Sequence, residues 1–498
     1  MTVAPQRRLV KTWRFRRRRR HLAERVGLVR LALPAALVLW FIWKARANAL
    51  FLLGIPVLMV MRGSVFFENA KPFWKPGRFD VVTLLMVWLA LVWVVTLVRR
   101  PRLDDTPMGL FGTGRVLPEE LPLLGIAALI ALHAMGTFSV SGDLSHALSV
   151  AAGIFYLVLG YLLVRGIACR ATRAETGEFL AAVVIVNTIA CGLFILHQGL
   201  HLPIYLGQSN ITYSLGGQTI SRATTFAPMF NLLALGFVLA KRRWTPAWLV
   251  VLAITLLAVL VSLTRTLLIA AVLGLVIAIV ARELSRPDFG RVARRVGTIV
   301  LAVVVVVVGF IRLAPAYWRF LLKRFGEFNS SSGAQVQNWH LRAIHWDAVQ
   351  RVVARSDLLL GIGFPKAGSN VVDALVYSYS SDMAWLPVMY RIGYVGLLLV
   401  GLLLAGFMAR ALWLSLKPPE ARRELCLTYF ITIALTVVMS FQMWTFMQPS
   451  IYPMGLWILA FVAAEALRPE EESSLSLASA GDLAPPHAAD RTPHAEPL

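Results

Sequence analysis

Residues 223–262 read ATTFAPMFNLLALGFVLAKRRWTPAWLVVLAITLLAVLVS, and this stretch decides the fold class. Two apolar runs, 223–240 and 245–262, flank a basic triplet at 241–243. Each run is about as long as a helix needs to cross the hydrocarbon core of a bilayer. The runs are continuous rather than alternating, and lipid offers no water to unpaired backbone groups, so helices are expected and a β-barrel is not. Basic residues stay on the cytoplasmic side of a membrane, so the triplet predicts a short cytoplasmic turn.

The same pattern fills most of the chain. Of its 498 residues 58% are hydrophobic and only 15% are charged, whereas a soluble domain carries about a quarter charged residues. The sequence therefore predicts an all-α polytopic membrane protein. Its thirteen candidate apolar runs lie at roughly 27–44, 47–62, 80–98, 121–138, 147–165, 178–197, 223–240, 245–262, 265–281, 297–313, 386–408, 425–444 and 449–466.

Basic clusters between alternate pairs of runs set the orientation from residue 99 onward. They place the connection 314–385 outside and the C-terminal tail in the cytoplasm. The basic N-terminal segment is also expected in the cytoplasm. Both termini then lie on the same side of the membrane, which requires an even number of crossings. We therefore expect about twelve transmembrane helices. One of the two runs 27–44 and 47–62 should then be interfacial or re-entrant, because Lys44 and Arg46 interrupt this region, and the sequence does not say which one spans.

The chain divides into five expected parts. These are a basic cytoplasmic segment 1–26, transmembrane helices in 27–313, a large extracytoplasmic loop 314–385, C-terminal transmembrane helices in 386–467 and a disordered cytoplasmic tail 468–498. The net charge of +23 sits mostly in the N-terminal segment and in short loops. Basic residues in these positions are typical of cytoplasmic segments that contact anionic lipid, so nucleic-acid binding is not expected. The three cysteines have no metal-ligand or disulfide spacing, so no metal is expected.

The connection 314–385 is the only long one, and a loop of this length in a compact bundle is usually functional or disordered. It contains an amphipathic stretch, Trp339 to Val353, with apolar residues at helical spacing. Gly361 and Gly363 follow, in a Gly-x-Gly pattern that by itself indicates only a turn. We expect this loop to form a helical cap over the external mouth of the bundle.

Four ionisable residues are predicted to face this external side: Arg222, Arg265, Arg342 and Asp382. Each arginine taken singly could be an anchor that extends its charge to the membrane surface. Because all four residues are predicted to lie under the same external loop, a shared functional site is favoured over separate membrane anchors. The planar guanidinium donates two hydrogen bonds to a phosphate and keeps its charge, and a neighbouring carboxylate can act as a general base.

Four stretches then resemble the O-antigen ligase and polysaccharide polymerase superfamily, the Wzy and WaaL type of bacterial envelope protein. They are RATTFAPMFNLLA at 222–234, SLTRTLLIAAVLG at 262–274, HLRAIHWDAVQRVVARSDLLLGIGF at 340–364 and DMAWLPVMYRIGYVGLL at 382–398. Each motif is short, and their order and spacing carry the resemblance. Ligases usually have a histidine where this chain has Asp382, so the pattern looks more like a polymerase.

The resemblance implies transfer of a glycan from an undecaprenyl diphosphate carrier to an acceptor hydroxyl, without cofactor, metal or nucleotide. In that chemistry Arg222, Arg265 and Arg342 would stabilise charge on the leaving diphosphate. Asp382 would accept the proton of the acceptor hydroxyl, although it could instead cap the next helix or pair with Arg391.

Three further candidates for substrate binding are Arg391, Trp346 and His345, the last of which could equally be a packing residue. The expected partners are the lipid-linked glycan, the bilayer and, for a polymerase, a chain-length regulator protein. Two alternatives stay open at this point. One is a ligase that moves finished glycan to lipid A core or another acceptor. The other is a transporter or flippase of lipid-linked sugars, which the lack of paired, broken repeats disfavours. The expected location is the bacterial inner membrane.

Overall fold

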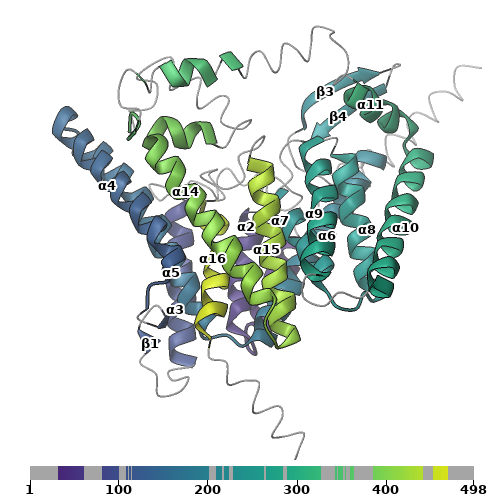
Figure 1. The fold of residues 1–498 in the computed structure, drawn as a ribbon, viewed down its shortest axis with the longest axis horizontal. Helices are drawn as coiled ribbons and strands as arrows, with labels where there is room; N and C mark the ends of the chain where they lie inside the picture. The colour runs from purple at the N-terminus through teal and green to yellow at the C-terminus, as the bar shows by residue number, and fades with distance from the viewer. Residues whose placement is uncertain are drawn as a thin grey trace, which may run out of the picture.

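The computed structural model describes most of the helical part of the chain (Figure 1). The described residues are 32–60, 81–99, 108–109, 112–113, 115–200, 209–215, 218–223, 228–262, 265–283, 289–326, 343–344, 346–351, 354, 359–363, 385–440 and 452–468. The first helices are Ala32–Lys44, η1 (Ala49–Leu53), α2 (Gly54–Val60), α3 (Val81–Arg99), η3 (Pro118–Glu120), α4 (Leu121–Ser141), α5 (Leu144–Cys169) and α6 (Arg173–Leu200). The later ones are α7 (Pro228–Ala240), α8 (Pro246–Val261), α9 (Arg265–Glu283), α10 (Phe289–Leu313), α11 (Pro315–Gly326), α14 (Trp385–Ser415), α15 (Glu420–Ser440) and α16 (Tyr452–Leu467).

The expectation of a helical membrane protein is confirmed. In the described part of the chain four helices are long and apolar enough to cross a membrane, and a fifth span is formed if the bent pair α10 and α11 counts as one. Shorter apolar helices fall in the other predicted runs, so each of the thirteen runs contains one apolar helix. The number of complete crossings stays a prediction.

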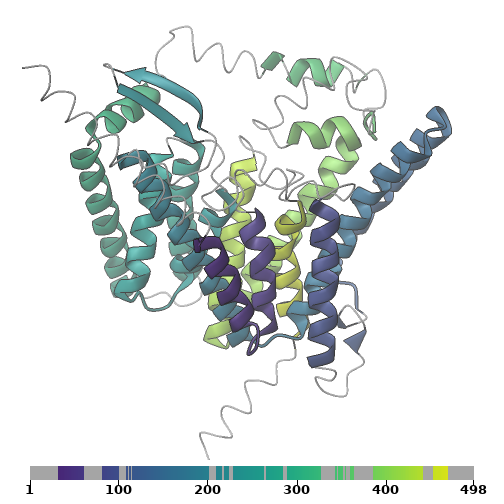
Figure 2. The same ribbon diagram turned by 180° about the vertical axis from the view of Figure 1, so that it is seen from behind.

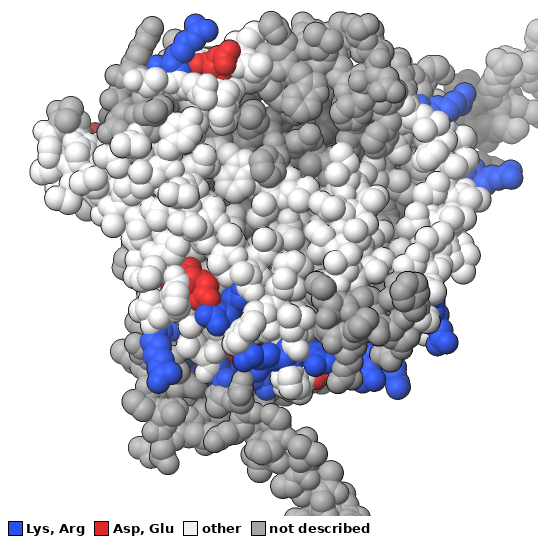
Figure 3. All heavy atoms as spheres, viewed as in Figure 1, with Lys and Arg blue, Asp and Glu red and all other residues white. Residues whose placement is uncertain are grey.

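Lysine and arginine side chains gather along one end of the bundle, which we call the basic end (Figure 3). It is marked by Arg99 at the end of α3, Lys241 after α7 and Arg282 near the end of α9. Helices α7, α9 and α14 end at this end, so their first residues lie at the opposite end, which we call the far end. Because α10 begins at the basic end, the chain leaves the bundle for residues 314–385 at the far end. The observed alternation of helices agrees with the alternation of basic loops in the sequence.

The first two apolar runs form a pair of short helices joined by a tight turn (Figure 2). This turn lies at the basic end, where the carbonyl of Ala45 accepts a hydrogen bond from Arg99 and the Asn48 side chain donates to the carbonyl of Glu175 over 2.9 Å. The helix Ala32–Lys44 therefore runs toward the basic end, and its thirteen residues span only about 20 Å. The following α2 leads back toward the far end. Of the two runs, 47–62 has the direction that a crossing from a cytoplasmic N-terminus needs.

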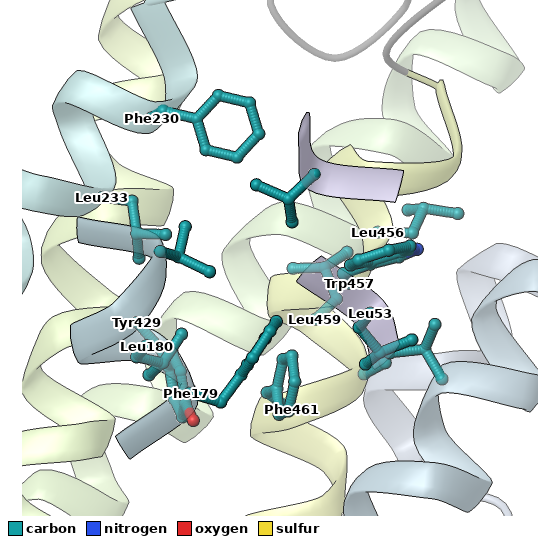
Figure 4. Close-up of a cluster of buried hydrophobic side chains, with 14 of the residues drawn as sticks. Leu53, Phe179, Leu180, Phe230, Leu233, Tyr429, Leu456, Trp457, Leu459 and Phe461 are labelled. Atoms are coloured by element: carbon teal, nitrogen blue, oxygen red, sulfur yellow. The ribbon is translucent and has the colours of Figure 1, made fainter. Parts of the chain in front are cut away.

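The largest core cluster takes in apolar side chains from most of the helices, and the part of it drawn in Figure 4 joins α6, α7, α15 and α16 with Leu53 of η1. The rings of Tyr429 and Phe461 stack with centroids 6.2 Å apart, and Phe179 meets Phe461 at 6.3 Å. Helices α7 and α15 approach closely because Gly236 has no side chain. A Cβ there would lie 2.7 Å from the hydroxyl oxygen of Thr432. Small residues at such contacts let membrane helices pack without a hydrophobic driving force between them.

Two short strand pairs accompany the helices. The larger joins β3 (Ser209–Leu215) to β4 (Gln218–Ala223) as an antiparallel hairpin at the far end (Figure 1), and the smaller joins β1 (Met108–Gly109) to β2 (Gly112–Thr113). The β3–β4 hairpin was not expected. Its signal is visible in the sequence, because β-branched and aromatic residues flank two consecutive glycines, a combination that favours a two-residue hairpin turn.

Buried ion pairs tie the helices together at the basic end. Glu465 of α16 is fully buried and lies between Arg173 of α6, Arg422 of α15 and Arg468, with Arg173 Nε 3.0 Å from its carboxylate. A second buried carboxylate, Glu120, accepts hydrogen bonds from Tyr161 and Arg165 of α5. Such groups are expensive to bury singly and are stable here because each carboxylate faces a guanidinium. The arginines of the basic end therefore stabilise the packing of the helices, in addition to marking the predicted cytoplasmic side.

Candidate functional site at the far end

The candidate site is built around a break in α14. The sequence predicts one continuous apolar run at 386–408, but the helix is interrupted at Ile392 (φ −124°, ψ 15°) and Gly393 (φ 64°, ψ −165°). Figure 1 shows the change of direction at the upper end of α14. A break releases backbone groups from the helical pattern, and in a membrane these groups need other partners.

Residues 359–363 of the long connection supply those partners. The backbone N–H groups of Ile362 and Gly363 donate to the carbonyls of Tyr390 and Arg391, each over 3.0 Å. In the other direction the N–H of Val395 donates to the carbonyl of Leu359 over 3.1 Å. Three backbone hydrogen bonds therefore dock a segment of the connection into the broken membrane helix, and we call this contact the joint.

The joint depends on three glycines. Gly361, Gly363 and Gly393 all have positive φ, a conformation that L side chains rarely adopt. Space is equally restricted, since a Cβ on Gly393 would lie 2.1 Å from the Leu359 oxygen and one on Gly361 would lie 2.5 Å from the Gly393 nitrogen. The Gly-x-Gly pattern that reads as an ordinary turn in the sequence is thus a fitted contact with a glycine far along the chain.

A side chain from α4 completes the joint. His133 Nε2 lies 2.8 Å from the carbonyl oxygen of Leu360, and a Cβ on Gly363 would come within 2.9 Å of the imidazole Nδ1. The joint therefore connects the two membrane helices α4 and α14 to one point of the connection.

The amphipathic stretch of the connection also reaches α14. Residues 346–351 are helical, Val349 is buried, and Gln350 Nε2 lies 3.5 Å from the Tyr394 hydroxyl. The expected helix within residues 339–353 is therefore present over its described part, and α11 turns by 109° from α10 at the same end of the bundle. Pro315 explains this turn, because proline cannot continue a helix from the preceding residues. Whether these helices together form a cap stays a prediction.

Arg391 is the predicted site residue that the structure describes most fully. It is half-buried, it directly precedes the break, and its carbonyl accepts the hydrogen bond from Gly363. Its guanidinium carbon lies 6.0 Å from the centre of the Tyr390 ring, at the limit of a cation–π contact. The joint thus fixes the backbone from which this cationic side chain projects.

The other predicted residues are placed less completely. Arg222 is paired with Ile211 in the β3–β4 hairpin, and Arg265 begins α9, so the backbones of both lie at the far end as expected. Trp346 lies half-buried in the helical residues of the connection. Arg342, His345 and Asp382 lie outside the described residues, so their predicted roles are untested.

Sequence reasoning missed His133 and Gly393. A single histidine in an apolar run carries no pattern, so His133 could be found only from the fold. Gly393 does have a signal, because a glycine that directly follows Tyr-Arg-Ile interrupts an otherwise apolar helix and so marks a possible break.

Comparison with protein-family models and with curated proteins found no match to this chain. The family resemblance therefore rests on the four sequence stretches quoted above.

Proposed function

We propose that this protein is a membrane glycosyltransferase of the bacterial inner membrane. It polymerises undecaprenyl-diphosphate-linked oligosaccharide repeats into O-antigen or exopolysaccharide at the external face, as a polymerase of the Wzy type. The proposal rests on the four stretches of sequence resemblance and on the positive-inside rule, which makes the basic end cytoplasmic.

The observation that carries the proposal is the joint. It holds a segment of the one long connection against a broken membrane helix next to Arg391, at the end opposite the basic residues. An enzyme that acts on a lipid-linked sugar needs such a place, where a loop outside the membrane meets a helix within it. The two resembling stretches at 340–364 and 382–398 are the two that the joint brings together.

The proposed reaction is a displacement at the anomeric carbon of the growing chain. The hydroxyl oxygen of the acceptor sugar forms the new glycosidic bond, while the bond from the anomeric carbon to the diphosphate oxygen breaks. The diphosphate leaves with the electron pair, and the hydroxyl proton passes to the Asp382 carboxylate. Arginine side chains at the far end stabilise the charge that develops on the leaving phosphate oxygens.

The test is the substitution Asp382→Asn in cells that make the glycan. Asparagine keeps the size of the side chain but cannot take a proton, and a general base contributes about a hundred- to ten-thousand-fold in rate. We expect little or no polymer at normal protein level, and lipid-linked single repeats should accumulate. If Asp382 only caps α14, polymer will survive, because Asn caps a helix about as well as Asp does.

Asp347→Asn is the matched control, because this aspartate lies in the same connection and is exposed. It should leave polymer length unchanged. The same assay separates the two enzymatic readings. A polymerase variant accumulates single repeats, whereas a ligase variant accumulates finished, lipid-linked polymer, and the second result would replace the polymerase proposal with the ligase.

The arginines are tested in the same cells. Ala at Arg222, Arg265 or Arg342 should nearly abolish polymer, and Lys should restore only part of it, since a point charge cannot reproduce the bidentate fork. Normal polymer from the Ala variants would leave these residues as membrane anchors.

A further inference from the structure

A buried polar cluster lies between α6 and α7. Asn187 Nδ2 donates to Asn231 Oδ1 over 3.0 Å, and Cys191 Sγ donates to the same oxygen over 3.2 Å. Asn231 and Cys191 are fully buried and Asn187 nearly so. Polar side chains inside a membrane bundle are costly and tend to mark functional sites.

The donor and acceptor pattern of this cluster is one-sided. Two donors converge on Asn231 Oδ1 and occupy both of its acceptor positions, which fixes the orientation of the amide. Its Nδ2 group, with two N–H donors, has no hydrogen-bond partner within the part of the chain that the structure describes. Buried donors in native proteins nearly always have an acceptor, so we expect an acceptor for the Asn231 Nδ2 group.

Asn231 lies on the far-end side of the bundle. It is three residues from the start of α7 and nine from its end, so about 14 Å of helix separates it from the basic end. The β3–β4 hairpin, which carries Arg222, leads into this helix from the far end. Phe230, which precedes it, and Leu233, two residues further on, are apolar core residues of the same helix (Figure 4).

We propose that the Asn231 amide is a substrate-binding donor that holds a phosphate oxygen of the lipid-linked diphosphate. The ligand atom must be an acceptor, because Nδ2 offers only N–H donors and Asn231 Oδ1 is already occupied. A sugar hydroxyl would also need an acceptor for its own proton, whereas phosphate oxygens only accept.

This inference rests on the proposed function for the identity of its ligand, and it adds a residue that the arginine and aspartate assignments do not contain. It also gives Asn187 a role. By bonding Asn231 Oδ1, Asn187 turns the Nδ2 group away from α6, so Asn187 is a positioning residue and Asn231 the binding one.

The experiment measures binding of undecaprenyl diphosphate to the purified full-length protein in nanodiscs. Asn231→Val removes the donor, and loss of a hydrogen bond to a charged group should weaken binding about ten- to a hundred-fold. Asn231→Asp keeps the oxygen that Asn187 and Cys191 bond but lacks the amide donors, so it should weaken binding as well. Thr188→Val is the control, because the hydroxyl of Thr188 donates only to Val184 of its own helix, and this variant should bind like the wild type.

A double variant, Asn187→Val with Asn231→Val, separates binding from structure. Removing both partners of a buried hydrogen bond is nearly neutral for stability. The double variant should therefore melt like the wild type and still bind weakly, whereas a pair with no contact to the ligand would keep wild-type affinity.

Three outcomes would overturn the inference. Wild-type affinity in Asn231→Val would show that the amide does not touch the ligand, and the proposed function would survive. Competition by phosphatidylglycerol as strong as that of undecaprenyl diphosphate would assign the acceptor to bulk phospholipid. Absence of any binding of undecaprenyl diphosphate to the wild type would instead remove the proposed function, and this inference with it.

Discussion

Replacing Gly393 by alanine should undock residues 359–363 from α14. The added methyl group meets two obstacles. The backbone has φ 64° and ψ −165°, a region that only glycine adopts readily, and the Cβ would lie 2.1 Å from the carbonyl oxygen of Leu359. That oxygen accepts the hydrogen bond from Val395, so the group that must move is a member of the joint itself.

The size of the effect follows from these two terms. A backbone with φ 64° and ψ −165° lies in a region essentially restricted to glycine, and it costs another residue about 1–3 kcal/mol. Displacing the Leu359 oxygen loses one hydrogen bond, with a net value of about 1 kcal/mol. The sum is about 2–4 kcal/mol, which at about 1.4 kcal/mol per factor of ten raises the population of the undocked state roughly 30- to 700-fold.

Hydrogen exchange followed by mass spectrometry measures this population directly. The three donors of the joint are the amides of Ile362, Gly363 and Val395, and their protection depends on docking. Peptides that contain them should lose protection in Gly393→Ala. Peptides from the core of α15 and α16 should not, because the change is local.

Gly401→Ala is the matched control. Gly401 lies two turns further along α14, and nothing would come within 4 Å of an added Cβ. Alanine there should stabilise the helix by about 0.5–1 kcal/mol. If Gly393→Ala keeps the protection of the wild type and of Gly401→Ala, then the glycine is not required, the joint does not exist as described, and the link between the connection and Arg391 is lost.

Two further predictions concern the basic end and the topology. Glu465→Gln leaves Arg173, Arg422 and Arg468 around a buried neutral group and should cost about 3–5 kcal/mol, whereas Glu424→Gln, which disrupts a partly exposed pair with Lys241, should cost less than about 1 kcal/mol. Thermal unfolding monitored with a thiol-reactive dye suits this comparison because all three cysteines are buried, and equal losses would contradict the assignment of Glu465 as the central charge. For the topology, single cysteines introduced in the 314–385 connection should react with an impermeant reagent in cells whose outer membrane admits it, and cysteines at either terminus should not. Labelling of the N-terminal segment alone would make both short N-terminal helices full crossings, thirteen in all, and labelling of the tail would reverse the orientation.

Much of the helical architecture could be predicted from the sequence. Apolar runs of membrane length and basic residues between them are strong, local signals, so the runs, their alternation and the far-end position of the long connection follow from them. The pairing of the N-terminal helices could not be predicted. Lys44 and Arg46 are compatible with an interfacial segment, and only the contacts from Arg99 and Asn48 reveal a turn at the basic end.

The site was harder to predict, because its contacts join residues far apart in the chain. The joint connects Gly361 to Gly393 and Leu360 to His133, and no local pattern encodes such a pairing. Arg391 could be chosen from its charge at a membrane edge, and the structure adds the reason for its position. The cluster of Asn187, Cys191 and Asn231 has an even weaker signal, since two asparagines 44 residues apart become a pair only when α6 and α7 pack together.

The two ends of the bundle are held together by different interactions, and this difference has a functional consequence. At the basic end Glu120 and Glu465 form ion pairs with arginine side chains, so these guanidinium groups stabilise the fold. At the far end the joint uses backbone donors and acceptors. Gly363 donates to the backbone carbonyl of Arg391, so the joint fixes the backbone at this residue through main-chain groups. For the proposed diphosphate ligand this matters, because a carboxylate used to fasten the site would compete with the phosphate for an arginine fork.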